Sequence, residues 1–264
     1  MIRSMYTAAT GMKAQQFYMD MISNNLSNVN ARGYKKQNVQ FKDLMYQTIR
    51  EPGSRNPEGA MAPSGIEVGL GVKVTGTARE FTQGSMANTG NNFDMAIEGI
   101  GMFQILTPDG SIAYTRDGQF QRSGDGTLVT SDGYYLYPEM ALPDGYDTIT
   151  VSPDGLVTAT RINAGNEENT EIGQIELARF INPAGLRSLG SNLYGPTVSS
   201  GEPLVGKPGQ DGNGKVMQQF IEESNVDMVD EMVGMISAQR AYEIVSKSIT
   251  VSEEMMQTAT NLKR

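Results

Sequence analysis

The sequence predicts an α+β protein: long N- and C-terminal helices pair as a coiled coil, and a central, mainly antiparallel β domain lies between them in the chain. Three observations support this. Apolar residues recur every three or four positions near both ends, the apolar period changes to two in the centre, and Asp-Gly pairs separate short apolar runs there. The predicted parts are a helical domain of residues 1–33 with 226–264, a connecting segment 34–67 containing an extended excursion 46–65, a β domain 68–214, and a return connector 215–225.

A row of apolar residues seven apart runs through the C-terminal segment. The row and the residues beside it that we expect on the same helix face are Met228, Met232, Met235, Ala238, Tyr242, Val245, Ile249, Met256 and Ala259. A period of seven held over five steps is typical of a helix that packs along its length against another helix. Ser224 and Asn225 are the expected caps at its start, followed by acids where the helix dipole favours them.

The N-terminal segment has a second narrow apolar stripe of similar length. It consists of Met5, Ala8, Met12, Gln15, Met19, Ile22, Leu26 and Val29. Gly33 suits the left-handed residue that ends a helix. Two such stripes at opposite ends of one chain most simply pair with each other, and methionine side chains adapt to imperfect packing.

Between the N-terminal stripe and the β domain, the helical spacing of apolar residues becomes less regular. Phe41, Leu44, Met45 and Ile49 fit one helical face. The following stretch disfavours both a helix and a central strand, and its marker residues are Tyr46, Ile49, Pro52, Pro57, Pro63 and Gly65. We expect an extended excursion or hairpin at 46–65.

The β domain is predicted as a meander of short strands. We expect strands at residues 72–81, 95–97, 102–106, 112–116, 119–122, 127–130, 134–137, 149–151, 157–160 and 172–180. Asp-Gly pairs begin at Asp109, Asp117, Asp125, Asp132, Asp144 and Asp154. Asp-Gly favours the type I′ hairpin turn, in which both central residues have positive φ.

Composition excludes several functions. The chain has 264 residues, 38% of them hydrophobic, with no cysteine and no histidine. Disulfides, thiol nucleophiles, imidazole bases and nearly all transition-metal sites are therefore excluded, and we expect no catalytic residue, metal or cofactor. Calcium binding and a glycosidase acid pair are also disfavoured, because each Asp-Gly aspartate already has a role in a turn. The protein is not expected to be an enzyme.

Charge also limits the partners. The net charge is −9, with seven basic and two acidic residues in 1–50 and four basic and eight acidic residues in 216–264. Nucleic acid is a poor partner for such a chain. The asymmetry is either solvated surface or a means of steering the two ends into register. We expect no cleaved signal peptide and no membrane span.

Several long motifs coincide with those of one known family. They are Ala8-Ala9-Thr10-Gly11-Met12, Ser23-Asn24-Asn25-Leu26-Ser27-Asn28-Val29-Asn30, Gly33-Tyr34-Lys35, Thr89-Gly90-Asn91-Asn92-Phe93-Asp94-Met95-Ala96-Ile97, Ala113-Tyr114-Thr115-Arg116-Asp117-Gly118, Ser224-Asn225-Val226, Glu231-Met232-Val233 and Ala238-Gln239-Arg240-Ala241-Tyr242-Glu243. On these motifs the chain resembles bacterial flagellar rod and hook proteins over essentially its full length. Tyr34 stands where Phe is usual, and Met102-Phe103 replaces a Phe-Phe pair. Within the family the resemblance is to distal rod subunits, because of the start Met1-Ile2-Arg3-Ser4, the length, and the stretch 46–65.

The resemblance implies a structural, self-assembling subunit of the basal-body distal rod. Such subunits polymerise as a helical tube that transmits torque from motor to hook, with the coiled coil lining the tube and the β domain facing outward. It implies contacts with proximal rod and hook-side axial proteins, surrounding bushing ring proteins and the flagellar type III export apparatus, but no nucleic acid or small-molecule substrate. The implied location is the rod outside the cytoplasmic membrane, in the periplasmic space of a two-membrane cell, after export without a cleaved signal.

Two further expectations and two alternatives follow. We expect the terminal arms to stay largely disordered until neighbouring copies bury them, and the excursion 46–65 to wedge between copies. One alternative is a proximal rod or hook subunit of the same family. The other is a secreted carbohydrate-binding β module, for which Tyr134, Tyr135 and Tyr137 are the grouped aromatics, although neighbours on one strand point to alternating faces.

Overall fold

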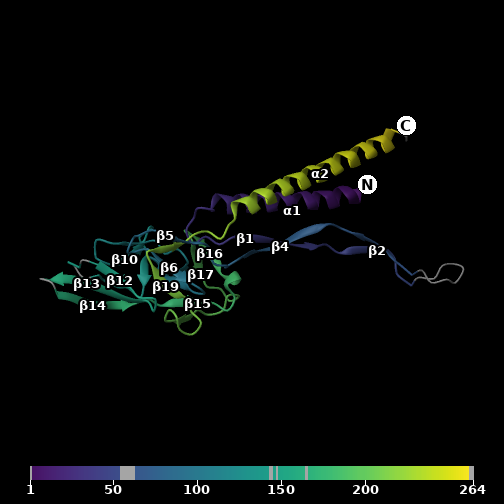
Figure 1. The fold of residues 1–264 in the computed structure, drawn as a ribbon. Helices are drawn as coiled ribbons and strands as arrows, with labels where there is room; N and C mark the ends of the chain where they lie inside the picture. Colours follow the sequence, from purple (N-terminus) through teal and green to yellow (C-terminus); the bar gives the residue numbers. More distant parts are fainter. Residues whose placement is uncertain (1, 54–62, 143–144, 147, 164–165, 262–264) are drawn as a thin grey trace. The chain divides into compact units, whose positions relative to one another are not determined.

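A computed structural model describes residues 2–53, 63–142, 145–146, 148–163 and 166–261, arranged as two compact units (Figure 1). The helical unit comprises Met1–Ser27, Gln37–Ala78 and Asp227–Arg264, and the β unit comprises Asn28–Lys36 and Arg79–Val226. The chain thus has the α+β content expected, with a helix near each end and antiparallel β structure between them. No helix in the described part of the chain is both long and apolar enough to cross a membrane.

The helical unit contains α1 (Ile2–Ser27) and α2 (Met228–Asn261), which contact each other in antiparallel orientation (Figure 1). The expected caps are wrong at both helices. The Asp227 side chain accepts hydrogen bonds from the backbone N–H groups of Val229 and Asp230, at 2.8 and 3.3 Å, and so caps α2 in place of Ser224 or Asn225. Gly33 has φ +64°, as expected, but α1 has already ended at Ser27.

Two pairs of strands complete the helical unit. Strand β1 (Gln37–Asp43) pairs with β4 (Val72–Arg79), and β2 (Tyr46–Arg50) pairs antiparallel with β3 (Ile66–Gly69). The helical face expected from Phe41 to Ile49 is therefore wrong. The region forms strands β1 and β2, and Phe41 of β1 packs edge-on against Tyr18 of α1, with ring centroids 6.2 Å apart. We call β2 and β3 the ribbon.

The β unit is built on a nine-stranded sheet. Its main path runs β16-β17-β8-β7-β11-β10-β9, and β15 joins both β7 and β18. The bounds are β7 Met102–Leu106, β8 Ile112–Thr115, β9 Phe120–Arg122, β10 Leu128–Thr130, β11 Tyr135–Tyr137, β15 Leu177–Arg179, β16 Arg187–Gly190, β17 Leu193–Gly195 and β18 Leu204–Gly206. A 3₁₀ turn, η1 (Pro183–Gly185), precedes β16.

Three smaller sheets surround this one. A three-stranded sheet has the order β12-β13-β14, β19 pairs with β6, and β20 pairs with β5. Their bounds are β5 Met86–Asn88, β6 Met95–Glu98, β12 Thr148–Val151, β13 Leu156–Asn163, β14 Asn166–Gln174, β19 Lys215–Gln218 and β20 Phe220–Glu222. The predicted strand at 172–180 is in fact two strands, β14 and β15.

The main core of the β unit lies between these sheets. It contains Phe103 and Phe120, packed edge to face with ring centroids 5.3 Å apart, together with Ile97, Ile105 and Leu177, all almost fully buried. Alternate residues of β7 point to this core and to a second cluster around Met102 and Tyr114. Both faces of this strand are therefore buried, which explains why apolar residues stand at four of its five positions.

The turns differ from the predicted type I′. In the turn at Asp109-Gly110, Thr107 N–H binds Ser111 O at 2.9 Å and Gly110 N–H binds Thr107 O at 2.9 Å. The turns ending at Gly126, Gly133 and Gly155 repeat this pattern, and only their glycines have positive φ, not the aspartates. These are three-residue hairpin loops with a left-handed glycine. At Asp117-Gly118 no hairpin forms, because β8 pairs with β7 and β17 while β9 pairs with β10.

A pair of glycine substitutions tests the turn geometry. Gly133 has φ +84° and Gly124 lies outside the left-handed region, and at both an added Cβ meets no atom within 4 Å. Gly133→Ala should lower the free energy of unfolding by about 1 kcal/mol through backbone strain alone. Gly124→Ala should leave it unchanged or raise it slightly. Urea denaturation of both variants measures the difference, and equal stabilities would contradict the turn assignment.

Candidate assembly interface

The face of α2 nearest α1 follows a strict alternation of four and three residues. Its members, which we call the seam, are Glu231, Met235, Ala238, Tyr242, Val245, Ile249, Ser252 and Met256, all buried or half-buried. Met235, Tyr242, Val245, Ile249 and Met256 were expected on this face. Met232 lies outside the seam and is 50% exposed, and Met228 is similarly exposed.

On α1, Ile22 is buried, while Met5, Met12, Met19 and Leu26 are half-buried. Val29 lies beyond the end of the helix and belongs to the β unit. The apolar stripe did not include three buried α1 residues, Ala14, Met21 and Asn25. Helix α1 also contacts β1, so its buried surface is wider than one stripe.

Three close approaches give the register of the two helices. A Cβ added at Gly11 would lie 3.9 Å from Val245 Cγ1, and one added at Gly234 would lie 3.3 Å from Ile22 Cδ1. Near the end of α1, Asn25 Nδ2 donates to Glu231 Oε2 at 3.3 Å. The contact at Gly234 is tight and the one at Gly11 is ordinary van der Waals contact, so side chains of the facing helix lie over both glycines, and the polar contact marks a third level.

The Asn25–Glu231 contact is buried and has a further connection. Asn25 Nδ2 donates to Gln37 O at 3.0 Å, and Gln37 N–H donates to Asn25 Oδ1 at 3.0 Å, so one amide joins α1, α2 and the start of β1. A polar residue inside a helix–helix seam typically specifies register, because any shift leaves a buried polar group unpaired. An apolar periodicity search cannot find such a residue.

Helix α2 carries a second apolar face, opposite the seam. Its members, which we call the outer face, are Val229, Val233, Ile236, Ile244, Val251 and Met255, all exposed. A helix that is apolar on two opposite faces normally has partners on both. Among the described residues, the seam is covered by α1 whereas the outer face stays exposed, so the outer face is a candidate interface.

The ribbon is the second exposed apolar surface. Met45, just before it, is exposed, as are Tyr46, Ile49 and Ile66 within it. Of the marker residues of the excursion, Pro52 and Pro63 are exposed and Gly65 is half-buried, whereas Pro57 lies outside the described residues. An isolated two-stranded hairpin is at best marginally stable, so these strands also favour a partner.

The β unit contains a fully buried cluster of three charges. Lys35 Nζ lies 2.5 Å from Glu222 Oε1, and Arg116 Nε lies 2.9 Å from Glu222 Oε2. Arg116 Nη1 also donates to Gly99 O and Gly101 O at 2.9 and 2.7 Å, and Lys35 Nζ donates to Thr82 O at 2.6 Å. Burial lowers the pKa of Lys35 below its ordinary value, and the Glu222 carboxylate opposes this shift.

This cluster joins the segment that follows α1 to the segment that precedes α2. Beside it, Gly33 N–H donates to Glu222 O at 2.9 Å, and Lys36 N–H donates to Asn225 Oδ1 at 2.7 Å. The segment that follows α1 and the segment that precedes α2 are therefore joined by backbone, side-chain and ionic contacts. Sequence reasoning missed the roles of Lys35 and Glu222, because a buried charge is recognised only beside its partner.

The described residues show little that suits an enzyme or a sugar-binding module. Among them, no three acidic side chains gather to hold a metal ion. On β11, Tyr135 and Tyr137 are partly exposed and flank the buried Leu136.

Comparison with known proteins agrees with this geometry. Residues 5–35 match the family model described as "Flagella basal body rod protein", residues 96–159 match "Flagellar hook protein FlgE/F/G D1 domain", and residues 217–262 match "Flagellar basal body rod FlgEFG protein C-terminal". The chain is 49% identical over 266 residues to "Flagellar basal-body rod protein FlgG" of Borreliella burgdorferi, covering all of both chains. The proteins of the same name in Agrobacterium fabrum and Bacillus subtilis are 45% and 38% identical, with coverage of 99% and 100% of this chain and all of each relative.

Two adjacent glutamates test the buried cluster. Glu222→Gln leaves Lys35 and Arg116 buried without their carboxylate and should lower the free energy of unfolding by about 3 kcal/mol or more. Glu223, whose pair with Arg32 is 3.9 Å long and exposed, is the matched control, and Glu223→Gln should change stability by less than about 1 kcal/mol. Unfolding of the β unit in denaturant measures the change in free energy of unfolding for both variants. Equal effects would show that the buried cluster does not stabilise the unit.

Proposed function

We infer that this chain, which belongs to the flagellar basal-body rod protein family, is a structural subunit of the distal rod of the bacterial flagellum and not an enzyme. It locates to the basal-body rod and assembles there with other axial proteins. Full-length coverage of the relatives carries this conclusion, because motifs at the ends and in the centre all belong to one family.

We propose that copies of the chain polymerise into a helical tube that transmits torque from motor to hook. The outer face of α2 supports this most directly, because its six exposed aliphatic side chains lie opposite a seam that is already covered. Helices α1 and α2 would form a coiled coil lining the tube, with their remaining apolar faces buried by neighbouring copies. The antiparallel contact and the four-three spacing of the seam support this pairing.

The finer placement is also a proposal. The rod would lie outside the cytoplasmic membrane, in the periplasmic space of a two-membrane cell, and the chain would pass through the flagellar export apparatus without a cleaved signal. Its neighbours would be proximal rod and hook-side axial proteins along the tube and bushing ring proteins around it. The excursion 46–65 would wedge between copies and keep the tube straight, consistent with its exposed apolar side chains.

Charge on the outer face of α2 should prevent assembly without unfolding the chain. Ile244 is 70% exposed, so Ile244→Asp should leave the helix content of the monomer unchanged. The same substitution should abolish polymerisation, because the carboxylate would be buried between copies. Gln239→Asp, on an exposed position beside that face, should still polymerise. Sedimentation and electron microscopy provide the readout, and tubes from Ile244→Asp would contradict the role of the outer face.

Removing the excursion should lower the stiffness of the assembled tube. A chain lacking residues 46–65 should form tubes with a shorter persistence length in electron micrographs, because the wedge between copies that keeps the tube straight is gone. A variant with the same stretch replaced by glycine and serine controls for length and should behave like the deletion. Equally stiff, straight tubes from either variant would reject the wedge.

A further inference from the structure

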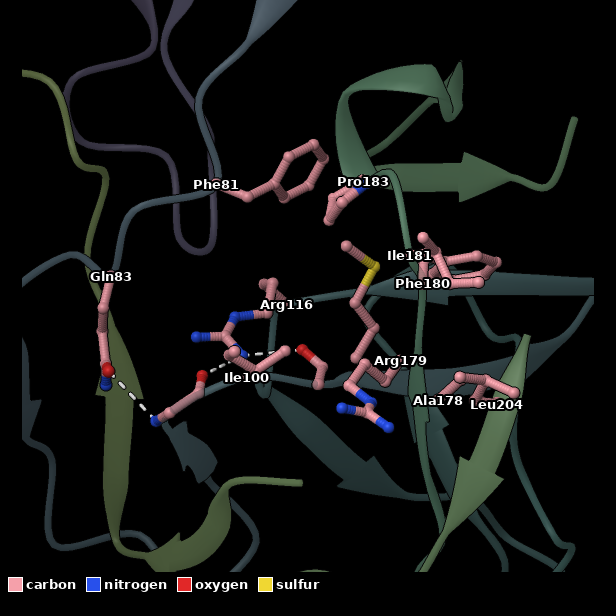
Figure 2. Close-up of a pocket in the computed structure, with 13 residues that line it drawn as sticks. Phe81, Gln83, Ile100, Arg116, Ala178, Arg179, Phe180, Ile181, Pro183 and Leu204 are labelled. Atoms are coloured by element: carbon pink, nitrogen blue, oxygen red, sulfur yellow. Dashed lines mark hydrogen bonds between the residues drawn. The ribbon is translucent and has the colours of Figure 1, made fainter. Parts of the chain in front are cut away.

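A preformed apolar pocket lies within the β unit (Figure 2). Its volume is about 620 Å³, and its lining residues belong to that unit alone. A pocket of this size with a mainly apolar lining is typical of sites that hold a small organic molecule. The apolar side chains of the lining are Phe81, Ile100, Met102, Phe180, Ile181, Pro183 and Leu204.

The mouth of the pocket is as apolar as its interior. Ile181 is 81% exposed, and Ile100 and Leu204 are exposed beside it. Large aliphatic side chains gathered around an apolar hollow mark a binding site, because covering them removes apolar surface from water. The body of a molecule that fits this pocket is therefore apolar.

Two of the polar side chains in the lining are already engaged. Gly99 N–H donates to Gln83 Oε1 at 3.0 Å, and Gln83 Nε2 donates to a backbone carbonyl at 3.2 Å. Arg116 Nη1 donates to the carbonyl groups of Gly99 and Gly101, as the dashed lines in Figure 2 show, and Arg116 Nε pairs with Glu222. These groups shape the pocket but have little left to offer a ligand.

Arg179 is the polar side chain that remains. It ends β15, a strand held between β7 and β18, so its backbone is fixed by the sheet. A Cβ added at Gly212 would lie 3.1 Å from Arg179 Nη1, so a turn packs against one side of the guanidinium. Within the residues that the structure describes, Arg179 has no hydrogen-bonded or ion-pair partner. The pocket thus offers one positioned guanidinium with donors to spare.

The charge around the pocket favours an anion. Arg116 belongs to the buried cluster in which two basic side chains share the single carboxylate of Glu222, so this wall of the pocket carries excess positive charge. A guanidinium binds a carboxylate through two parallel hydrogen bonds. One free guanidinium matches one carboxylate, whereas a cationic head group would be repelled.

We propose that the pocket binds a single-chain amphiphile with one carboxylate, of the free fatty acid type. The aliphatic chain fills the hollow between Met102 and Phe180, and the carboxylate pairs with Arg179. The molecule is held without chemical change. This binding requires a single copy of the chain, so it goes beyond the proposed function, and its failure would leave the rod assignment intact.

Calorimetric titration of decanoate into the dilute 264-residue chain tests the proposal. With decanoate kept below the concentration at which it forms micelles, we expect saturable binding of one molecule per chain. Hexanoate, four methylenes shorter, should bind about a hundredfold more weakly. Decyltrimethylammonium, which has the same tail and a cationic head, should bind at least about tenfold more weakly. Absence of saturable decanoate binding, or equal binding of the cation, would overturn the proposal.

Two arginines separate a specific contact from general attraction. Arg179→Gln should weaken decanoate binding about tenfold, because the charged pair is lost. Arg187→Gln, at an exposed position of β16 outside the lining, should leave the affinity unchanged. Thermal unfolding of both variants checks that they fold. Equal affinities of the two folded variants would contradict the role of Arg179.

A second pair of variants remains decisive if Arg179→Gln fails to fold. Ile181 and Leu189 are both exposed, so a polar residue at either position should leave the β unit folded. Ile181→Asn should weaken decanoate binding about fivefold by removing apolar surface at the mouth. Leu189→Asn, outside the lining, should not. Equal affinities here would reject the pocket as the site.

Methyl NMR of the methionines locates the bound molecule. The resonance of Met102, identified through Met102→Leu, should shift when decanoate is added. Shifts confined to methionines of α1 and α2 would place decanoate on the helices and reject the pocket. Co-sedimentation with vesicles of dioleoylphosphatidylglycerol, without binding of free decanoate, would show that a membrane surface is recognised instead and would also overturn the proposal.

Discussion

The buried contact of the Glu222 carboxylate with Lys35 and Arg116 is the interaction on which the β unit depends. It joins Lys35 to Glu222, which lie 187 positions apart, and Arg116, which directly follows β8, contacts the same carboxylate. Buried ion pairs add little net stability relative to well-packed apolar residues, but an unpaired member is strongly unfavourable. The cluster therefore selects one arrangement, in which the segment after α1 and the segment before α2 leave the β unit side by side.

The helical unit, in contrast to the β unit, leaves much of its apolar surface exposed. Its two helices meet at the seam and α1 also packs on β1, while the outer face of α2 and most of the ribbon remain exposed. Ordering the backbone opposes folding by about 1–2 kcal/mol per residue, and a narrow seam offsets only part of that for two long helices. On the proposed function, neighbouring copies would cover its remaining faces. The β unit holds itself together, whereas the helical unit leaves apolar surface exposed, and this division suits the proposed assembly of copies into a polymer.

Much of this architecture could be predicted, because the spacing of apolar residues can be recognised in the sequence without knowing which residues are in contact. The spacing of three and four near Met12 and Tyr242 predicts helices, and the period of two around Phe103 predicts strands. The failures have physical causes. Asp-Gly is compatible with two hairpin geometries, and the position of Gly133 as the last of three loop residues is decided by strand register. Asp227 caps α2 because it directly precedes the first helical residue, whereas the Asn225 side chain accepts a hydrogen bond from the backbone N–H of Lys36, 189 residues away in sequence.

Polar residues inside packed surfaces were the hardest to foresee. Asn25 and Glu231 lie in the helix contact, and Lys35 and Glu222 lie in the core of the β unit, yet each belongs to a class usually found at the surface. Only the tertiary fold supplies the partner that makes burial tolerable. The resemblance to flagellar rod proteins located the motifs containing Asn25, Lys35 and Glu231 but said nothing of these contacts.

Amide hydrogen exchange of dilute monomer and of assembled protein tests the central claim most directly. The account predicts that in the monomer, amides of β6 to β8 exchange slowly while those of α1 and α2 exchange rapidly, and that the helical amides become strongly protected only on assembly. Slow exchange throughout α1 and α2 in the dilute monomer, unchanged by assembly, would contradict it.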